Sequence, residues 1–130
     1  MIDTGIATAA KLLFLETVAQ DKCMIALYTS EASIGPNTKR YTPVGEVDGK
    51  GYKAGGQLLR NGKAWTQGDA ACLTWDNAVW QNATITAGGF MIYDASQDNT
   101  VLFVGSWGSN YSSTNGPFTV NIAEDQITFS

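Results

Sequence analysis

The stretch from Trp80 to Trp107 constrains the fold of this chain most strongly, because it carries the period-two pattern of a β-strand. In residues 83–87, alanine and isoleucine alternate with threonine, which predicts a strand with one buried face. The strand continues beyond Gly88-Gly89, where a bulge would change the face that the following side chains occupy. Turn-forming residues at 94–100 and the apolar run 101–104 complete a β-hairpin, which we place at the centre of a sheet.

Shorter strands are expected on both sides of this hairpin. Residues 23–29 are apolar on both faces, so this strand is expected to be covered on both sides, for instance by a partner sheet and by the N-terminal helix. Asn61-Gly62 is a tight-turn dipeptide that predicts a hairpin between 58–59 and 64–66. We also expect strands at 44–47, 70–76, 117–122 and 127–129, and polar loops at 30–42 and 108–116.

The N-terminal segment, residues 1–22, predicts a helix or arm. Asp3 or Thr4 is expected to cap a helix that runs to about Ala19. Its apolar residues cover more of the circumference than a surface helix needs, so the segment docks either on the sheet or on another subunit. The apolar residues expected to contact a partner are Ile6, Leu12, Leu13, Phe14, Leu15 and Val18.

These patterns favour a mainly β fold in one domain. The chain has 130 residues, enough to bury a core without disulfides, and its 14 glycines suit short strands separated by turns. Seven to nine short strands with no helices between them predict a single antiparallel β-sandwich or jelly-roll domain. We expect residues 1–22 to form the short N-terminal helix or arm, and residues 23–130 to form the β-sandwich domain.

Charge and composition argue against several classes of function. The chain has no histidine, the commonest general base and transition-metal ligand. Its net charge is −4 and its Lys and Arg residues are scattered, so we expect no nucleic-acid partner. Lys11 and Glu16 interrupt the apolar N-terminal run, so we expect no membrane or targeting segment and a protein made in the cytoplasm.

The glycine-rich stretch and the two cysteines are also interpreted as structural. Residues 48–56 lack the Lys-Ser/Thr pair of a phosphate-binding loop, so we expect their glycines to allow close passage of the chain. Cys23 and Cys72 lie in apolar runs, which predicts buried, unbridged thiols. A disulfide stays open as an alternative if their strands are neighbours.

Three pairs of acidic residues are candidates for chemistry. The pairs are Asp94 with Asp98, Glu124 with Asp125, and Glu46 with Asp48. The first two lie in turns, where we expect solvated side chains that bond to the backbone. The third would supply two ligands, too few for a calcium site. We therefore expect no enzyme activity, no metal and no cofactor.

The tryptophans support an alternative function. They are Trp65, Trp75, Trp80 and Trp107. Aromatic faces suit the apolar faces of pyranose rings, although we expect Trp75 and Trp107 to lie in the core. The alternative is a carbohydrate-binding β-sandwich module that attaches to host glycans.

Turn and core motifs along most of the chain form a recognisable set. They include Ile25-Ala26-Leu27-Tyr28-Thr29, Gly35-Pro36-Asn37-Thr38, Gly45-Glu46-Val47, Ile92-Tyr93-Asp94 and Thr114-Asn115-Gly116. From Ile25 to Ile122 the chain resembles a class of small β-rich proteins of tailed bacteriophages. The resemblance implies a virion structural protein that decorates or cements the capsid, or lies in the neck or tail. Gly88-Gly89 departs from the pattern, because similar proteins often carry an arginine-aromatic or arginine-glycine pair there.

The predicted function is therefore a non-enzymatic phage virion protein, and a capsid decoration or cement protein is preferred. Its expected partner is the major capsid protein or another virion protein, bound by a homo-oligomer because symmetric sites favour symmetric binders. Besides the N-terminal apolar residues, the polar loops are expected to meet the capsid. Their candidate contacts are Ile34, Pro36, Tyr111 and Asn115.

Overall fold

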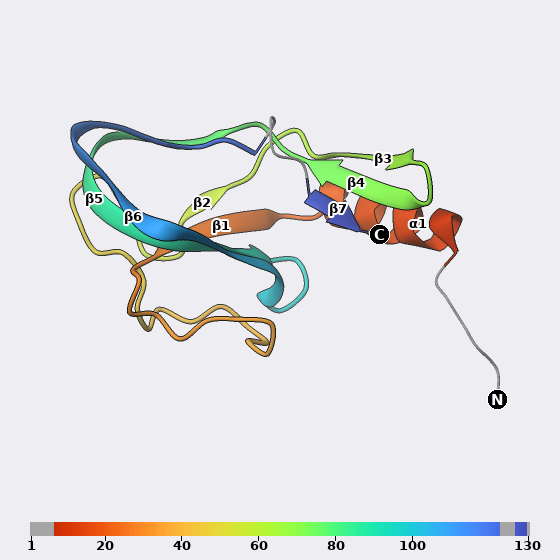
Figure 1. Cartoon of the computed structure of the whole chain (residues 1–130), viewed down its shortest axis with the longest axis horizontal. Coiled ribbons are helices and arrows are strands. Elements are labelled where there is room, and N and C mark those ends of the chain that lie inside the picture. The colour runs from red at the N-terminus through yellow and green to blue at the C-terminus, as the bar shows by residue number, and fades with distance from the viewer. Residues whose placement is uncertain (1–6, 123–126, 130) are drawn as a thin grey trace.

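The computed structural model describes residues 7–122 and 127–129, which form one helix and seven strands (Figure 1). The predicted mainly β fold with a short N-terminal helix is confirmed for this part of the chain. In chain order the elements are α1 (Thr8–Gln20), β1 (Cys23–Tyr28), β2 (Gln57–Leu58), β3 (Lys63–Gln67), β4 (Ala70–Thr74), β5 (Ala78–Asp94), β6 (Thr100–Val120) and β7 (Ile127–Phe129).

The strands form two sheets in which every pair is antiparallel, as predicted. One sheet has the order β2-β1-β5-β6 and the other the order β3-β4-β7. The helix α1 packs against β3 and β4 (Figure 1). β5 lies inside its sheet, as expected for the central hairpin, whereas β6 lies at the edge.

The hairpin of β5 and β6 dominates the molecule, and its strands are longer than predicted. They contain 17 and 21 residues and curl over together in Figure 1. Their register shifts at four places, and such irregularities allow a long ribbon to bend. The predicted change of face at Gly88-Gly89 is confirmed, because Ala87 and Ile92 lie in one apolar cluster and Met91 lies in another.

The predicted polar loop at 108–116 is wrong, because these residues belong to β6. Tyr111, Ser112 and Ser113 pair with β5, whereas residues 107–110 have no partner in the register. On the exposed face, the hydroxyls of Thr86 and Ser112 lie 2.7 Å apart. A strand with one solvated face needs such polar residues, so polarity alone did not distinguish it from a loop.

Two shorter predictions are also corrected. Asn61-Gly62 lies in a bend, with Asn61 in the left-handed region at φ 56°, but it does not close a hairpin. The two strands that flank it do not pair with each other: β2 pairs with β1, and β3 pairs with β4. Residues 44–47 form no strand and make a single bridge, between Glu46 and Tyr28.

Apolar clusters lie on both faces of the first sheet. The larger cluster joins α1, β1, β4, β5 and the end of β6. The smaller contains Tyr28 and Met91, and Ile34 packs against it. β1 is covered on both sides as predicted, but segment 29–42 provides part of the cover on the second face, where we expected a sheet or the helix.

The helix α1 docks within its own chain. Leu15 is fully buried and Val18 is 3% exposed in the larger cluster. Ala7 precedes the helix and supplies no side-chain cap, while the predicted caps Asp3 and Thr4 lie outside the described residues. In the described part of the chain, no helix is both long and apolar enough to cross a membrane.

The prediction for the two cysteines is confirmed. Cys23 and Cys72 are buried and are not joined by a disulfide. The Cys23 thiol donates a hydrogen bond to the Val18 carbonyl oxygen, with 3.3 Å between sulfur and oxygen. Burial, together with the nearby carboxylates of Asp94 and Asp21, raises the pKa of the Cys23 thiol to about 12. Cys23 is therefore a thiol in the folded protein and a poor nucleophile.

Candidate functional site

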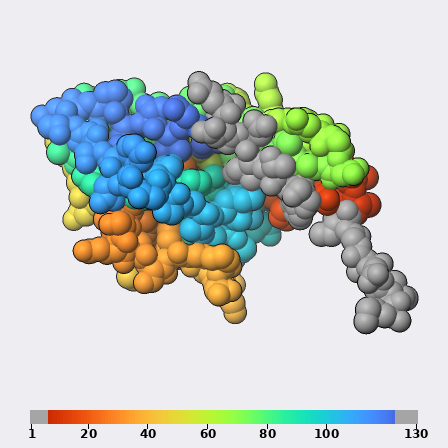
Figure 2. Space-filling model, in the orientation of Figure 1, coloured from red at the N-terminus to blue at the C-terminus, as the bar shows by residue number. Residues whose placement is uncertain are grey.

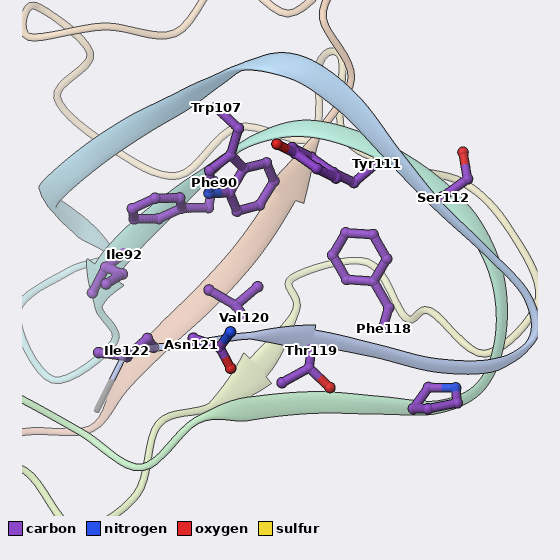
Figure 3. A pocket seen from close by; sticks show the side chains of 11 residues that line it. Phe90, Ile92, Trp107, Tyr111, Ser112, Phe118, Thr119, Val120, Asn121 and Ile122 are labelled. Carbon is purple, nitrogen blue, oxygen red and sulfur yellow. The ribbon is translucent and has the colours of Figure 1, made fainter. Parts of the chain in front are cut away.

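An aromatic cavity of about 450 Å³ lies against the curled β5–β6 hairpin (Figure 3). Its volume is within the range of small-ligand sites. Most of its lining comes from β6 and the residues that follow β6, and Phe90 and Ile92 come from β5. The full lining is Phe90, Ile92, Trp107, Tyr111, Ser112, Pro117, Phe118, Thr119, Val120, Asn121 and Ile122.

Trp107 is the centre of this aromatic cavity. Its ring lies 5.6 Å from the Phe90 ring, 6.4 Å from the Phe118 ring and 6.2 Å from the Tyr111 ring, measured between centroids. Tyr111 meets it edge-on and is 55% exposed. The described lining has aromatic and hydroxyl groups but no carboxylate, amine or thiol, so its chemistry suits binding rather than proton transfer.

The tryptophans lie at different depths. Trp75 is 2% exposed, which confirms its predicted place in the core, and Trp80 is 5% exposed. Trp107 packs against the core but is half-buried and lines the cavity, and Trp65 is also half-buried. A stacking surface would therefore use Trp107 together with Tyr111, rather than a pair of exposed tryptophans.

A polar centre around Glu46 holds the long connection between β1 and β2, residues 29–56, in place. The Tyr41 hydroxyl donates to Glu46 Oε1 at 2.5 Å, and the Tyr52 hydroxyl donates to Oε2. The amide N–H of Gly55 also donates to Oε2, at 2.9 Å. The Tyr52 hydroxyl in turn accepts a hydrogen bond from the Leu27 amide of β1. Glu46 thereby joins Tyr41 to residues 52–55 of this connection, and Tyr52 links them to β1.

Two further tyrosines reinforce this Glu46 centre. The Tyr28 hydroxyl donates to the Thr42 carbonyl oxygen at 2.6 Å, and the Tyr93 hydroxyl donates to the Gly55 carbonyl oxygen at 2.7 Å. Burial, and the nearby Glu46 carboxylate, raise the pKa of both phenols. These hydroxyls therefore remain protonated donors at neutral pH.

The Glu46 centre does not have the chemistry of a cation site. Both Glu46 oxygens accept hydrogen bonds from N–H or O–H groups, and Asp48 is exposed. In the part of the chain that the structure describes, no group of three or more His, Cys, Asp or Glu residues is placed to hold a metal. The carboxylate is built into the fold as a hydrogen-bond acceptor.

Replacing Glu46 with glutamine is expected to lower the free energy of unfolding by about 1–3 kcal/mol. The amide has one accepting oxygen, and its NH₂ group would face N–H or O–H donors that the carboxylate now satisfies. Urea unfolding measures the loss. Glu31→Gln, an exposed position in the same region, should change stability by less than about 0.5 kcal/mol. Equal effects at the two positions would contradict a structural role for Glu46.

The predicted contact residues of the N-terminal segment separate into two groups. Leu15 and Val18 are buried and Leu12 is half-buried, so these face the protein's own core. Leu13 is 66% exposed and Phe14 is 47% exposed. Figure 2 shows α1 (red) at the molecular surface beside β3 and β4 (green). Ile6 lies outside the described residues.

The other predicted contacts lie on different surfaces. Ile34 is half-buried over the smaller cluster, and Pro36 is exposed. Tyr111 lines the aromatic cavity. Asn115 is exposed on β6, where its backbone N–H donates a hydrogen bond to the Thr84 hydroxyl. These four residues and the α1 residues thus do not form one continuous described site.

The acidic pairs are also placed differently from the prediction. Asp98 is solvated and forms an exposed ion pair with Arg40, but Asp94 is 1% exposed at the end of β5. The prediction of a solvated Asp94 is therefore wrong, because the turn between α1 and β1 packs over it: the Ala95 amide bonds to the Lys22 carbonyl oxygen. Glu124 and Asp125 lie outside the described residues.

Comparisons of this chain with protein-family models, with curated proteins and with solved structures find no match.

Proposed function

We propose that this chain is a non-enzymatic structural protein of a phage virion, made in the bacterial cytoplasm, that decorates or cements the capsid by binding the major capsid protein. The observation that carries the proposal is the surface of α1. Leu13 is 66% exposed on a helix whose Leu15 is fully buried. The helix is therefore held rigidly while it presents large apolar side chains to a partner.

The resemblance to tailed-phage proteins supports the choice of partner. A capsid offers many symmetry-related copies of one surface, which suits a homo-oligomer of this chain. A neck or tail location is the alternative within the same class. A map of the particle at near-atomic resolution would distinguish these locations by the protein that contacts α1.

We also interpret the fold as a curled form of the predicted β-sandwich or jelly roll. The support comes from aromatic contacts along the bent hairpin. Trp80 and Phe118 pair across the strands at the open end of the β5–β6 ribbon, with 6.4 Å between ring centroids, and Phe118 also contacts Trp107, which lies near the middle of the ribbon. The open end of the ribbon thereby folds over its middle part and encloses part of one core, as opposed sheets do in a sandwich.

Replacing Leu13 with serine is expected to weaken binding to purified capsids by about 10- to 100-fold, the value of burying one leucine side chain. Val44→Ser is the matched control, because Val44 is a 72% exposed apolar residue away from α1. It should leave binding within about twofold of the unchanged protein. Co-sedimentation of each variant with undecorated particles measures the difference.

Two results would contradict this proposal. The first is the absence of the chain from gradient-purified particles of the encoding phage, measured by peptide mass spectrometry. The second is a Leu13→Ser protein that decorates particles as well as the unchanged protein, which would remove α1 as the contact.

The aromatic cavity favours glycan binding as a second candidate function. Trp107 and Tyr111 offer aromatic surface, and Ser112, Thr119 and Asn121 offer hydrogen-bonding groups in the same lining. This combination suits a pyranose ring, which has apolar faces and a rim of hydroxyls. A glycan array that includes host surface polysaccharides tests the candidate with the purified chain.

A further inference from the structure

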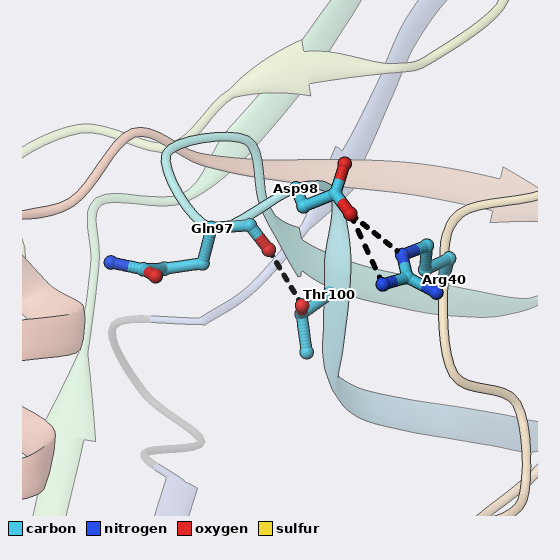
Figure 4. A network of polar contacts seen from close by, with 4 residues as sticks. All are labelled: Arg40, Gln97, Asp98 and Thr100. Atoms are coloured by element: carbon cyan, nitrogen blue, oxygen red, sulfur yellow. Dashed lines mark hydrogen bonds and ion pairs between the residues drawn. The ribbon is translucent and has the colours of Figure 1, made fainter.

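The outer edge of β6 has a partner at one end only. At that end, segment 39–41 lies antiparallel to the strand: the Val101 amide bonds to the Lys39 carbonyl oxygen at 2.9 Å. The Tyr41 amide bonds to the Asn99 carbonyl oxygen at 3.0 Å. The ion pair of Arg40 with Asp98 lies beside these bonds (Figure 4). The chain itself thus demonstrates that this edge accepts an added strand.

Beyond Val101 the edge is open. Among the described residues, no backbone hydrogen bond outside the β5–β6 pairing involves residues 102–106. Residues 103–106 pair in regular register with residues 89–92, so the strand is not interrupted there. Every second residue of a regular strand directs its N–H and C=O groups away from its partner. These groups are available to another chain.

The features that usually protect an edge strand are missing from residues 103–106, because the register shift at Leu102 lies just before them. Natural edges carry charged side chains, proline or bulges that prevent further pairing. β6 contains no charged residue in its 21 positions, and its Gly108 and Pro117 lie beyond the open stretch. The apolar residues 101–104 are half-buried, whereas Met91 and Ile92 on β5 are 0% and 1% exposed. An added strand would cover this apolar surface.

A groove follows the open edge between β6 and segment 29–38. It consists of two hollows of about 410 and 480 Å³, which share Val104 in their linings. The second hollow also reaches Gly88 and Gly89 of β5, so it extends from the edge over the face of the sheet. Gly35, Pro36 and Thr38 form one wall of the first hollow. Neither described lining contains a charged side chain. Figure 2 shows segment 30–40 (orange) beside β6 (blue).

We propose that this groove binds an extended, uncharged segment of another protein, which adds to the first sheet as a further strand beside β6. Backbone hydrogen bonds to residues 102–106 supply much of the affinity, and small apolar or hydroxyl side chains fill the two hollows. A charged side chain would lose its hydration there without gaining an ionic partner. This surface is separate from α1 and does not depend on the proposed role in a virion.

A second copy of this chain fits the groove less well than a single extended segment. The second copy would bring its own segment 29–38 along its own β6. Pairing of the two β6 edges would therefore place two such walls at one junction. An isolated extended segment needs only the space between one wall and one strand.

A displayed library of random heptapeptides, selected on the full chain, tests this proposal. The expected result is enrichment of uncharged peptides rich in Val, Thr, Ile and Ser. A synthetic copy of the most enriched peptide should slow hydrogen exchange of backbone amides within residues 102–106. The same peptide methylated at alternate backbone nitrogens should bind at least tenfold more weakly, because it cannot pair with a strand.

Gly35→Trp provides the test on the protein side. A Cβ atom at Gly35 would have no heavy atom within 4 Å, so the fold accepts a side chain there while the groove is narrowed. We expect at least a tenfold loss of peptide binding. Thr66→Trp, at an exposed position on β3, is the size-matched control and should bind normally.

Three outcomes would overturn the proposal. One is a selection in which no peptide prefers the unchanged protein over Gly35→Trp. Another is enrichment of charged peptides whose affinity for the protein is unchanged by methylation of their backbone nitrogens. The third is a stable dimer in sedimentation that Gly35→Trp converts to monomer, since the groove would then hold a second copy of this chain.

Discussion

Replacing Gly56 with alanine is expected to destabilise the protein by about 4 kcal/mol or more, a large fraction of the total stability of a small domain. Gly56 has φ +81°, in the left-handed region, and an added Cβ would lie 1.8 Å from the Ile25 carbonyl oxygen. It would also lie 2.8 Å from the Ala26 Cα. Since all these contacts are with the backbone of β1, no side chain can move aside to relieve them.

Gly68→Ala separates this steric effect from backbone strain. Gly68 also has a left-handed φ, +63°, but its Cβ would meet no atom within 4 Å. Its expected cost is therefore the conformational one alone, about 1–2 kcal/mol. Urea unfolding of both variants measures the difference. Similar losses at the two positions would contradict the close passage of the chain over β1.

Replacing Asp94 with asparagine is expected to stabilise the protein at pH 7 by on the order of 2–3 kcal/mol. Asp94 is 1% exposed, and its Oδ1 accepts a hydrogen bond of 2.9 Å from the Ser96 amide. Its pKa is raised from 3.8 to about 6, first by burial and then by the neighbouring Asp21 carboxyl. Asparagine keeps an oxygen acceptor for Ser96 and removes the buried charge.

The direction of the pH dependence follows from this raised pKa. The folded protein holds the Asp94 proton more tightly than the unfolded chain does. The contribution of Asp94 to stability is therefore complete below about pH 4 and is lost as the pH rises through about 6. Asp94→Asn should match the unchanged protein near pH 4 and exceed it at pH 7.

Unfolding by urea between pH 4 and pH 8 measures this difference. Asp98→Asn is the control, because it removes an 81% exposed carboxylate from the same turn. It should change stability by less than about 1 kcal/mol, as exposed ion pairs usually do. If the two proteins differed in free energy of unfolding by the same amount at every pH, the raised pKa of Asp94 would be contradicted.

Local patterns were sufficient to predict the central hairpin. The alternation in residues 83–87 and the two glycines after it identified both β5 and the change of face, because these depend on neighbouring residues in the strand. The helix was equally readable from its apolar residues. The polar part of β6 was not, since a solvated strand face and a loop use the same residue types.

The candidate surfaces depended on tertiary structure. Leu13 and Leu15 are the same residue type, and only the packing of α1 against β3 and β4 decides which of them faces a partner. The Glu46 centre and the groove beside β6 could not be predicted, because they join segments far apart in the sequence. By itself the sequence determined the period of each strong strand, the absence of histidine and the lack of charge in residues 100–120. Tertiary structure decided which polar groups are buried and which strand lies at an edge, since burial and pairing are properties of distant contacts rather than of neighbours.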